Sequence, residues 1–258
     1  MNDLCLYQNL HLLRGRVRLL DRHIGLLDRC SRELFGRPYA PDRQQLELRA
    51  AACSGARREE GAPSAFVRLE WTADGEERLV PAGLSYYVGY ALRSVQYRGV
   101  SIGCTPPLDG YPTPAREAAV AAARRMAGCA GGQVGVLCGP DGSYHSVEGA
   151  PIAIVRDYTV LLPPESVPCT VPAGAAGAAG HRFVAPQSVE AQLLAEAVRA
   201  AGLEPEVRPV GCDERTTFDE LFWLDCRGIT ALSHLDGRPL MALVAERVAD
   251  ALENLFRK

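Results

Sequence analysis

The stretch LLDRHIGLL, residues 19–27, carries the clearest fold signal in the chain. Its apolar side chains, continued by Cys30 and Leu34, recur at intervals of three and four residues, which predicts an amphipathic helix closing at Gly36. Two apolar segments of strand length, residues 4–7 and 12–17, precede it and predict an opening hairpin. The first elements are therefore two short strands and a helix.

Further along, the first half continues with a predicted helix at 42–53 and a hairpin whose turn is Asp74-Gly75. Residues 86–100 continue the extended pattern. Between Gly103 and Pro114 lie four prolines and two glycines, a composition typical of an interdomain linker. We therefore expect a domain at 1–104, a linker at 105–113 and a domain at 114–258.

The second half alternates predicted helices and strands irregularly. Thr113 and Ser188 are typical helix caps, and a closing amphipathic helix is expected at 241–255. Short strands are expected at 134–138, 144–147, 152–155, 160–162, 222–224 and 229–232. Residues 173–180 are all small and predict a loop, either an active-site cover or a permissive insertion. The fold class is mixed α+β in two halves, with the cleft between them as the expected ligand site.

Composition excludes several classes of function. The 258 residues are 47% hydrophobic with a net charge of -3, so a sizeable core is expected and nucleic acid is not an expected partner. No run reaches the length of a membrane span and no export signal opens the chain, which predicts a cytoplasmic protein without a membrane partner. Of the 28 basic residues only Lys258 is a lysine, so no internal lysine amine performs chemistry.

Nine cysteines occur without a Cys-x-x-Cys pair or a nearby histidine pair, so we expect reduced thiols and no metal site. A reactive cysteine would need a neighbour that lowers its pKa. Cys104 and Cys226 are the candidates to inspect.

Several stretches together resemble the fold-type IV pyridoxal-phosphate enzymes, which include branched-chain and D-amino-acid aminotransferases and aminodeoxychorismate lyase. Residues 19–27 are similar to the family's histidine-containing helix, and residues 90–99 to its arginine-bearing strand. Residues 219–222 and 227–230, with 236–239 behind them, resemble a strand pair of the family. The resemblance implies two α/β domains, a cofactor at their interface and a homodimer that completes each site.

The same resemblance implies that the usual cofactor contacts are replaced here. The family's Schiff-base lysine aligns at or near Thr113, and its phosphate-binding arginine aligns with Leu26. A family asparagine that follows the ring-nitrogen glutamate by five residues aligns with Pro151. The family's glutamate that pairs with the pyridine nitrogen aligns with Ser146. Aligning it with Glu148 would require shifting the alignment by two residues, which would put the following apolar strand out of register with the family. The family's phosphate-binding helix start falls at residues 187–190, which brings the acidic Glu190 near the phosphate.

We therefore predict a class IV aminotransferase-like protein that has lost lysine-dependent chemistry and binds a small anion or carboxylate in its cleft. Its expected ligand-binding residues are Arg93, Thr113, Ser146, Ser188, Arg227, Gly228, Ile229 and Thr230. No cofactor is expected, and any pyridoxal phosphate would be held without a covalent link. No residue is catalytic by the family's chemistry, and His145, Cys104 and Cys226 are the weak candidates.

Two alternatives remain open. One is a cofactor-independent lyase or isomerase that acts on a small carboxylate and uses His145, a tyrosine or a cysteine as acid or base. The other is a divergent pyridoxal-phosphate-dependent aminotransferase or aminodeoxychorismate lyase, in which Lys258 of a partner subunit would have to supply the amine. Structural readings also stand beside the functional ones: His23 is expected to be architectural, and Arg93 is as readily a surface arginine as a carboxylate anchor.

Overall fold

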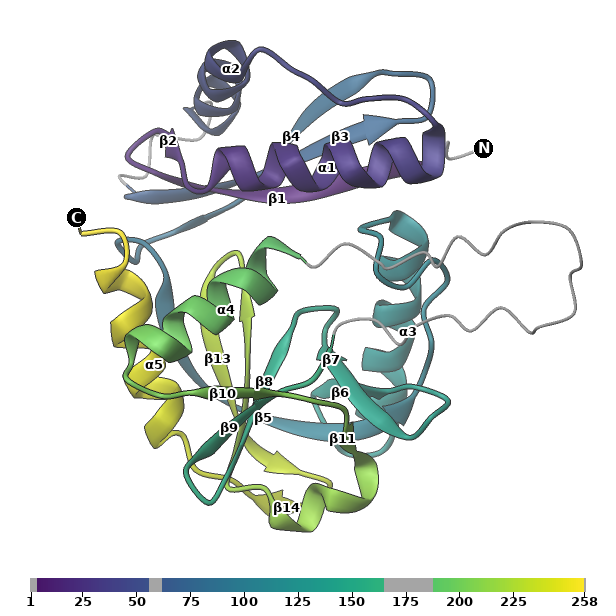
Figure 1. Ribbon diagram of the computed structural model, residues 1–258, viewed down its shortest axis with the longest axis vertical. Coiled ribbons are helices and arrows are strands. Elements are labelled where there is room, and N and C mark those ends of the chain that lie inside the picture. The colour runs from purple at the N-terminus through teal and green to yellow at the C-terminus, as the bar shows by residue number, and fades with distance from the viewer. Residues whose placement is uncertain (1–3, 56–61, 165–187, 258) are drawn as a thin grey trace, which may run out of the picture.

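The computed structural model describes residues 4–55, 62–164 and 188–257, which form two α/β halves, each built on its own sheet (Figure 1). The predicted loop at 173–180, together with Gln187 and Lys258, lies outside the described residues.

The first half is a four-stranded antiparallel sheet with the order β2-β1-β3-β4 among the described residues. Its strands are β1 (Cys5–Leu13), β2 (Arg16–Val17), β3 (Ser64–Thr72) and β4 (Glu77–Ser85). Helices α1 (Leu20–Phe35) and α2 (Arg43–Gly55) pack on it. The helix predicted from residues 19–27 is therefore confirmed, and it ends at Gly36 in a left-handed conformation, which glycine adopts readily.

An opening hairpin is present, because β1 and β2 pair antiparallel, but the predicted position of its turn was wrong. Residues 5–13 form one continuous strand, and the chain turns only after it, at Arg14 and Gly15, both with positive φ. The polar residues that suggested a break lie on both faces of this one strand, and Gln8 shares the face of the buried Leu6 and Leu10. Two of them, Gln8 and His11, are themselves buried, and their hydrogen bonds to His23 and Ser64 explain why the strand tolerates them.

The second half is a mixed, ten-stranded sheet in the described part of the chain, with the order β10-β9-β8-β12-β13-β5-β6-β7-β11 and β14 paired to β13. Its strands are β5 (Ala91–Gly103), β6 (Val134–Cys138), β7 (Ser143–Val147), β8 (Ile152–Arg156), β9 (Thr159–Leu162), β10 (Pro205–Val207), β11 (Val210–Gly211), β12 (Glu220–Asp225), β13 (Gly228–Leu235) and β14 (Arg238–Pro239). The pairs β5–β6, β5–β13 and β9–β10 are parallel.

The prediction that residues 86–100 belong to the first half was wrong, because β5 hydrogen-bonds between β13 and β6 in the second sheet. Parallel strands such as β5 and β6 need a crossover connection, and α3 (Pro114–Cys129) provides it. The proline-rich residues 105–113 therefore connect a strand to a helix within the second half. The change of sheet occurs earlier, between β4 and β5, so the predicted domain 1–104 contains one strand of the other sheet.

In the described part of the chain, helices α3, α4 and α5 cover the second sheet (Figure 1). Helices α4 (Val189–Ala200) and α5 (Leu243–Asn254) pack against each other and share one apolar core with β8, β9, β12 and β13. Helix α3 packs on β5 and β6 through Ala123 and Ala127. The start of α5 is held by the buried Glu220, whose carboxylate accepts hydrogen bonds from the amides of Val244 and Ala245 at 2.8–3.0 Å.

A largely buried ion pair joins the two halves. Arg18, just before α1, donates from Nη1 to Oε1 of Glu253 in α5 at 2.7 Å. The same guanidinium lies over the rings of Tyr90 and Phe256, 5.0 and 4.4 Å from their centroids. Glu253 also accepts a hydrogen bond from the amide of Tyr90. This cluster fixes the halves to each other beside α5.

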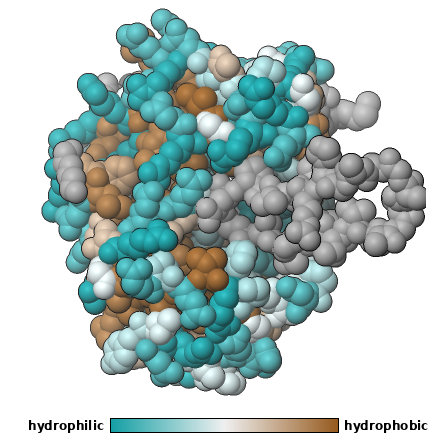
Figure 2. Space-filling view, in the orientation of Figure 1, coloured by the Kyte–Doolittle hydropathy of each residue, from teal (hydrophilic) through white to brown (hydrophobic). Residues whose placement is uncertain are grey.

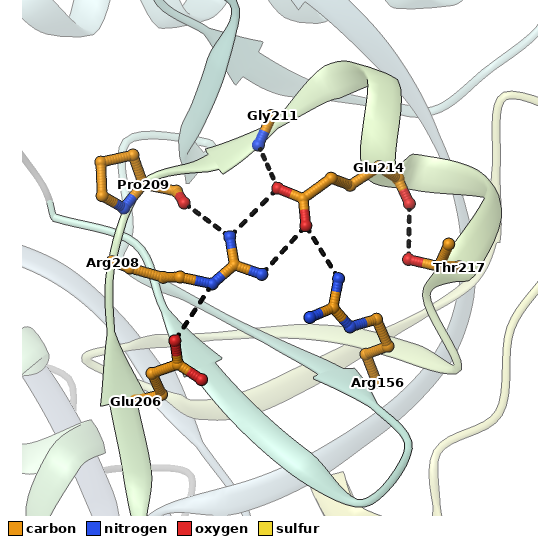
Figure 3. A network of polar contacts seen from close by, with 7 residues as sticks. All are labelled: Arg156, Glu206, Arg208, Pro209, Gly211, Glu214 and Thr217. Carbon is orange, nitrogen blue, oxygen red and sulfur yellow. Dashed lines mark hydrogen bonds and ion pairs between the residues drawn. The ribbon is translucent and has the colours of Figure 1, made fainter.

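A second ionic network ties β8, β10 and η2 (Cys212–Thr217) together (Figure 3). Glu214 in η2 accepts two hydrogen bonds from Arg208, at 3.1 and 2.9 Å, one from Arg156 at 2.9 Å and one from the amide of Gly211 at 3.0 Å. Because four donors converge on it, the carboxylate is held in its ionised form.

The face seen in Figure 2 is mostly hydrophilic, with apolar areas between the polar ones. Among the described residues, no helix is long and apolar enough to cross a membrane. The same part of the chain contains no group of three or more histidine, cysteine and acidic side chains arranged to hold a metal ion.

Candidate functional site

A cavity of about 640 Å³ lies between the two halves. The small sheet contributes side chains of β1, β3 and β4 to its wall. The second half contributes α3, the β7–β8 turn, the start of α4 and the β12–β13 turn. Its walls therefore come from segments far apart in sequence, and its size is in the range of small-molecule sites.

One side of α3 forms a charged wall of this cavity. The helix exposes residues to it at helical spacing, namely Arg116, Glu117, Val120, Ala121, Arg124 and Arg125. Between Arg116 and Arg125 the helix rises by about 13 Å at its usual rise per residue. A row of guanidinium groups thus runs along one side of the cavity.

Most charges of the cavity are paired. Arg116 lies 3.4 Å from Asp109, and Arg124 pairs with Glu148. The acids Glu117 and Asp225 are paired instead with arginines that do not line the cavity, Arg68 at 2.6 Å and Arg93 at 3.6 Å.

Because Arg68 and Arg93 pair with these two acids from outside the cavity, some arginines that line the cavity keep no acidic partner. In the part of the chain that the structure describes, Arg125 and Arg227 line the cavity without an ion-pair partner within 4.0 Å. Both residues are exposed. The cavity therefore offers a ligand two guanidinium groups that make no ion pair within the described residues, and such groups favour an anion, while Asp225 and Glu190 are acids of the same lining.

The small sheet contributes Tyr7 to the cavity wall, beside Glu117 near the start of α3. The guanidinium of Arg68 lies 3.8 Å from the centroid of the Tyr7 ring, and the same arginine pairs with Glu117. Burial and then the carboxylate of Glu117 raise the pKa of Tyr7, so its hydroxyl stays protonated at neutral pH. The carboxylate of Glu117 accepts a hydrogen bond from this hydroxyl, so Tyr7 is a protonated, hydrogen-bonded group of the cavity wall.

The tip of the β12–β13 hairpin enters the cavity with Asp225, Cys226 and Arg227. Burial raises the pKa of Asp225 and, together with the acids Asp225 and Glu190, holds the pKa of Cys226 well above its usual value. Cys226 thus remains a thiol, which argues against its predicted role as a reactive cysteine. The Arg227 guanidinium lies 5.9 Å from the centroid of Phe66 on β3, within the range of a cation–π contact.

Some of the predicted residues meet at this cavity. Ser188, Cys226 and Arg227 line it, and so do Leu26, Pro151 and Glu190, the positions that the resemblance matches to cofactor contacts of the family. Ser188 also caps α4, since its Oγ accepts a hydrogen bond from the amide of Ala191 at 3.0 Å.

Other predicted residues have structural partners and do not line the cavity. Thr113 is fully buried and caps α3 through the amide of Arg116. Arg93 faces Asp225. Both positions were predicted to bind ligand directly, and the structure makes Thr113 a helix cap and Arg93 a partner of a cavity acid.

Of the turn at residues 227–230, which was predicted to bind an anion, only Arg227 lines the cavity. Gly228 has φ +134° and lies so close to β5 that an added Cβ would be 2.1 Å from the carbonyl oxygen of Ala91. Ile229 and Thr230 are fully buried in β13, and among the described residues the Thr230 hydroxyl has no hydrogen-bond partner. Parallel pairing with β5 explains this burial.

The match of Ser146 to the family's glutamate is not supported. Ser146 is buried on β7, with its Oγ 3.2 Å from Nδ1 of His145, whereas Glu148 lines the cavity. Glu148 and Gly149 both have positive φ and form a tight turn closed by the pairing of Val147 with Ala150. Because this turn is so short, β8 can still begin in register when Glu148 is matched to the family's glutamate. The shift of the next strand is therefore no longer an argument against that match.

The weak catalytic candidates His145 and Cys104 lie behind the cavity wall. His145 is buried, with Nε2 3.4 Å from the carbonyl oxygen of Cys104, and burial lowers its pKa despite Asp109 nearby. Burial and Asp109 raise the pKa of Cys104. Neither residue lines the cavity, so neither reaches a ligand there in this conformation.

Tyr7 and the arginines of α3 line the cavity but were not predicted as site residues. The signal for the helix was present, because charged residues interrupt its alanine-rich sequence at 116–117 and again at 124–125, about two turns apart. Tyr7 gave no such signal, because an aromatic residue on a strand is more often part of a core.

No protein-family model and no curated protein matches the chain. Solved structures, however, do match the chain. The chain is similar to the branched-chain amino acid aminotransferase from Escherichia coli, with a TM-score of 0.72, 14% identity, and coverage of 99% of this chain and 85% of that one. It is also similar to the fold IV-transaminase CpuTA1 from Curtobacterium pusillum, with a TM-score of 0.72, 18% identity, and coverage of 98% and 86%.

A third match is a putative 4-amino-4-deoxychorismate lyase from Legionella pneumophila, with a TM-score of 0.73, 12% identity, and coverage of 97% of this chain and 90% of that one. At such low identity the likeness concerns the fold, and it spans nearly the whole chain. The mixed α/β architecture that the sequence resemblance implied is thereby confirmed. The chain has the fold of the class IV, or fold-type IV, aminotransferases.

Proposed function

We propose that this chain is a repurposed protein of the class IV aminotransferase fold, which binds a small anionic metabolite between its two sheets and has lost lysine-dependent pyridoxal-phosphate chemistry. The observation that carries the proposal is that Arg125 and Arg227 line the cavity without an ion-pair partner within 4.0 Å among the described residues. A carboxylate or phosphate can form two parallel hydrogen bonds with either guanidinium.

The residues present do not fit covalently held pyridoxal phosphate, which the fold family implies. No lysine lines the cavity among the described residues, and the single lysine of the sequence is Lys258. At the phosphate end, Leu26 offers no donor and Glu190 brings a negative charge into the first turn of α4. Glu148 suits the group, as a carboxylate for a ring nitrogen, but it supplies no amine. We therefore derive no step through this cofactor.

The proposal is tested by titrating the purified protein with succinate and with inorganic phosphate in a calorimeter. Arg227→Gln should weaken binding of the anion that binds by about 10- to 100-fold, because a charge-assisted hydrogen bond is removed. Arg29→Gln is the matched control, since Arg29 is exposed on α1 and does not line the cavity. Equal weakening by both variants, or none by Arg227→Gln, would refute the cavity as the anion site.

A cofactor-independent lyase or isomerase is the second candidate, and Tyr7 is the observation that favours it. Tyr7 lines the same cavity as Arg227, and its hydroxyl is protonated and hydrogen-bonded to Glu117, so an O–H group that can act as an acid belongs to the cavity wall. His145 and Cys104, considered for this role from the sequence, do not line the cavity. Tyr7→Phe should abolish turnover of a bound carboxylate and leave its affinity within about 5-fold, because the phenyl ring keeps the packing.

The remaining alternative is a divergent pyridoxal-phosphate-dependent aminotransferase or lyase, which the fold equally allows. It requires an amine from Lys258, in the same chain or in the partner of a homodimer. Incubation with pyridoxal phosphate followed by borohydride should leave no phosphopyridoxyl adduct in the mass spectrum. An adduct on Lys258, absent in Lys258→Arg, would overturn the loss of lysine chemistry, while reversible binding without an adduct would identify a non-covalent ligand. Sedimentation velocity tests the proposed homodimer.

A further inference from the structure

Two cysteines far apart in sequence meet away from the cavity. Cys138 is the last residue of β6, and Cys212 is the first residue of η2. Their Sγ atoms are 2.7 Å apart, although 74 positions separate the residues in the chain. A disulfide bond is about 2.05 Å long, so the sulfur atoms need to approach by only about 0.7 Å to become bonded.

The backbone on both sides of this pair is fixed. The carbonyl oxygen of Cys138 accepts a hydrogen bond from the amide of Cys104 at 3.1 Å, and the amide of Cys212 donates to the carbonyl oxygen of Gly142 at 2.8 Å. β11, which directly precedes η2, pairs with β7, the neighbour of β6. The sheet itself therefore brings the two thiols together.

The two thiols differ in access to solvent. Cys138 is 7% exposed and Cys212 is half-buried. Burial and the neighbouring Cys212 thiol raise the pKa of Cys138, while Arg215 acts in the opposite direction. Cys212 is thus the sulfur that a small oxidant reaches, and Cys138 is the partner that lies behind it.

We propose that Cys138 and Cys212 form an oxidation site, at which a low-molecular-weight disulfide such as oxidised glutathione converts the two thiols into an intramolecular disulfide. The thiolate of Cys212 attacks one sulfur of the reagent, forms a mixed disulfide and releases one thiolate, which takes up the proton that Cys212 lost. Cys138 then loses its proton and attacks Sγ of Cys212. The Cys138–Cys212 bond forms, the mixed disulfide breaks, and the second reagent thiolate leaves with that proton.

The balance of this exchange is two protein thiols and one reagent disulfide giving one protein disulfide and two reagent thiols. The bond closes a long loop of chain that contains Glu148 and Ser188, which both line the cavity. Because a crosslink over so long a loop restricts the unfolded chain, the oxidised protein should melt about 5–15 °C higher than the reduced protein. This inference does not depend on the identity of the cavity ligand.

The experiment exposes the full-length, reduced protein to oxidised glutathione and follows its intact mass. The mass should fall by two hydrogen atoms without addition of glutathione, and the denatured protein should titrate seven thiols in place of nine. Peptide mapping should find one crosslink, between Cys138 and Cys212. Dithiothreitol should restore nine thiols and the lower melting temperature.

Cys138→Ser and Cys212→Ser should each abolish the crosslink, and the second should also lose the early mixed disulfide. Cys129→Ser is the control, because Cys129 is exposed at the end of α3 and should leave the crosslink unchanged. If Cys138→Ser fails to fold, the loss or persistence of the crosslink in Cys212→Ser decides the test. A crosslink between other cysteines, a stable glutathione adduct on Cys212, or nine titratable thiols after exposure would overturn the proposal.

Discussion

Replacing Glu214 by glutamine should destabilise the protein in a pH-dependent way. The carboxylate of Glu214 is the centre of the network in Figure 3, and both of its oxygen atoms accept hydrogen bonds. The hydrogen bonds from Arg208, followed by that from the Gly211 amide, lower the pKa of Glu214 from 4.5 to about 2. A glutamine at this position keeps the shape of the side chain and removes its charge.

The size of the effect follows from that pKa. A carboxyl group with pKa values of 4.5 unfolded and about 2 folded contributes at most about 3 kcal/mol at neutral pH. The Glu214 side chain keeps 27% of its surface exposed, and solvent screening reduces the expected loss in Glu214→Gln to about 1–2 kcal/mol. Because the folded pKa is depressed, this stabilisation is fully present above pH 4.5 and is lost as the pH falls towards 2.

Urea unfolding of both proteins, at several pH values from 7 to 3, measures this loss. The difference in free energy of unfolding should stay constant from pH 7 to about pH 5 and fall by more than half by pH 3. Glu206→Gln is the matched control: Glu206 is 54% exposed and meets only Nε of Arg208, at 3.3 Å, so its loss should stay below about 0.5 kcal/mol. A Glu214→Gln difference that is the same at pH 7 and pH 3 would refute the linkage.

Three further predictions concern the frame around the cavity. Glu220→Gln should cost about 1–3 kcal/mol in urea unfolding, because the first amides of α5 lose a buried carboxylate; an unchanged midpoint would contradict this. Gly228→Ala should destabilise by more than about 3 kcal/mol or prevent soluble expression, since its Cβ would overlap the backbone of Ala91, and a wild-type melting temperature would contradict the packing. In a double-mutant cycle of Arg18→Ala and Glu253→Ala, a coupling of about 0.5–3 kcal/mol is expected, and additivity would show that the pair does not join the halves.

Local patterns were sufficient for most helices and strands. The apolar spacing of residues 19–27 predicts α1, and the hydroxyl groups of Thr113 and Ser188 predict the starts of α3 and α4, because these signals act within a few residues. The sequence failed where the partner of a segment mattered. The polar residues Gln8 and His11 suggested a break in a strand, since nothing local shows that buried partners await them.

The candidate site was predicted in part for the same reason. Arg227 and Ser188 were identified from their place in the resemblance and do line the cavity, whereas Thr113, Ser146 and Thr230 occupy buried structural positions. The distinction between Ser146 and Glu148 depends on a turn of two residues with positive φ, which residue spacing alone does not reveal.

The sequence by itself determined which chemistry is available: its one lysine is Lys258, and its other basic residues are arginines. That fact needs no coordinates, because a Schiff base requires an amine that arginine does not supply. Only the tertiary structure decided which arginines remain for a ligand. Arg93 and Arg68 are taken by Asp225 and Glu117, while Arg227 faces the cavity, and such pairings arise when strands and helices distant in sequence pack together.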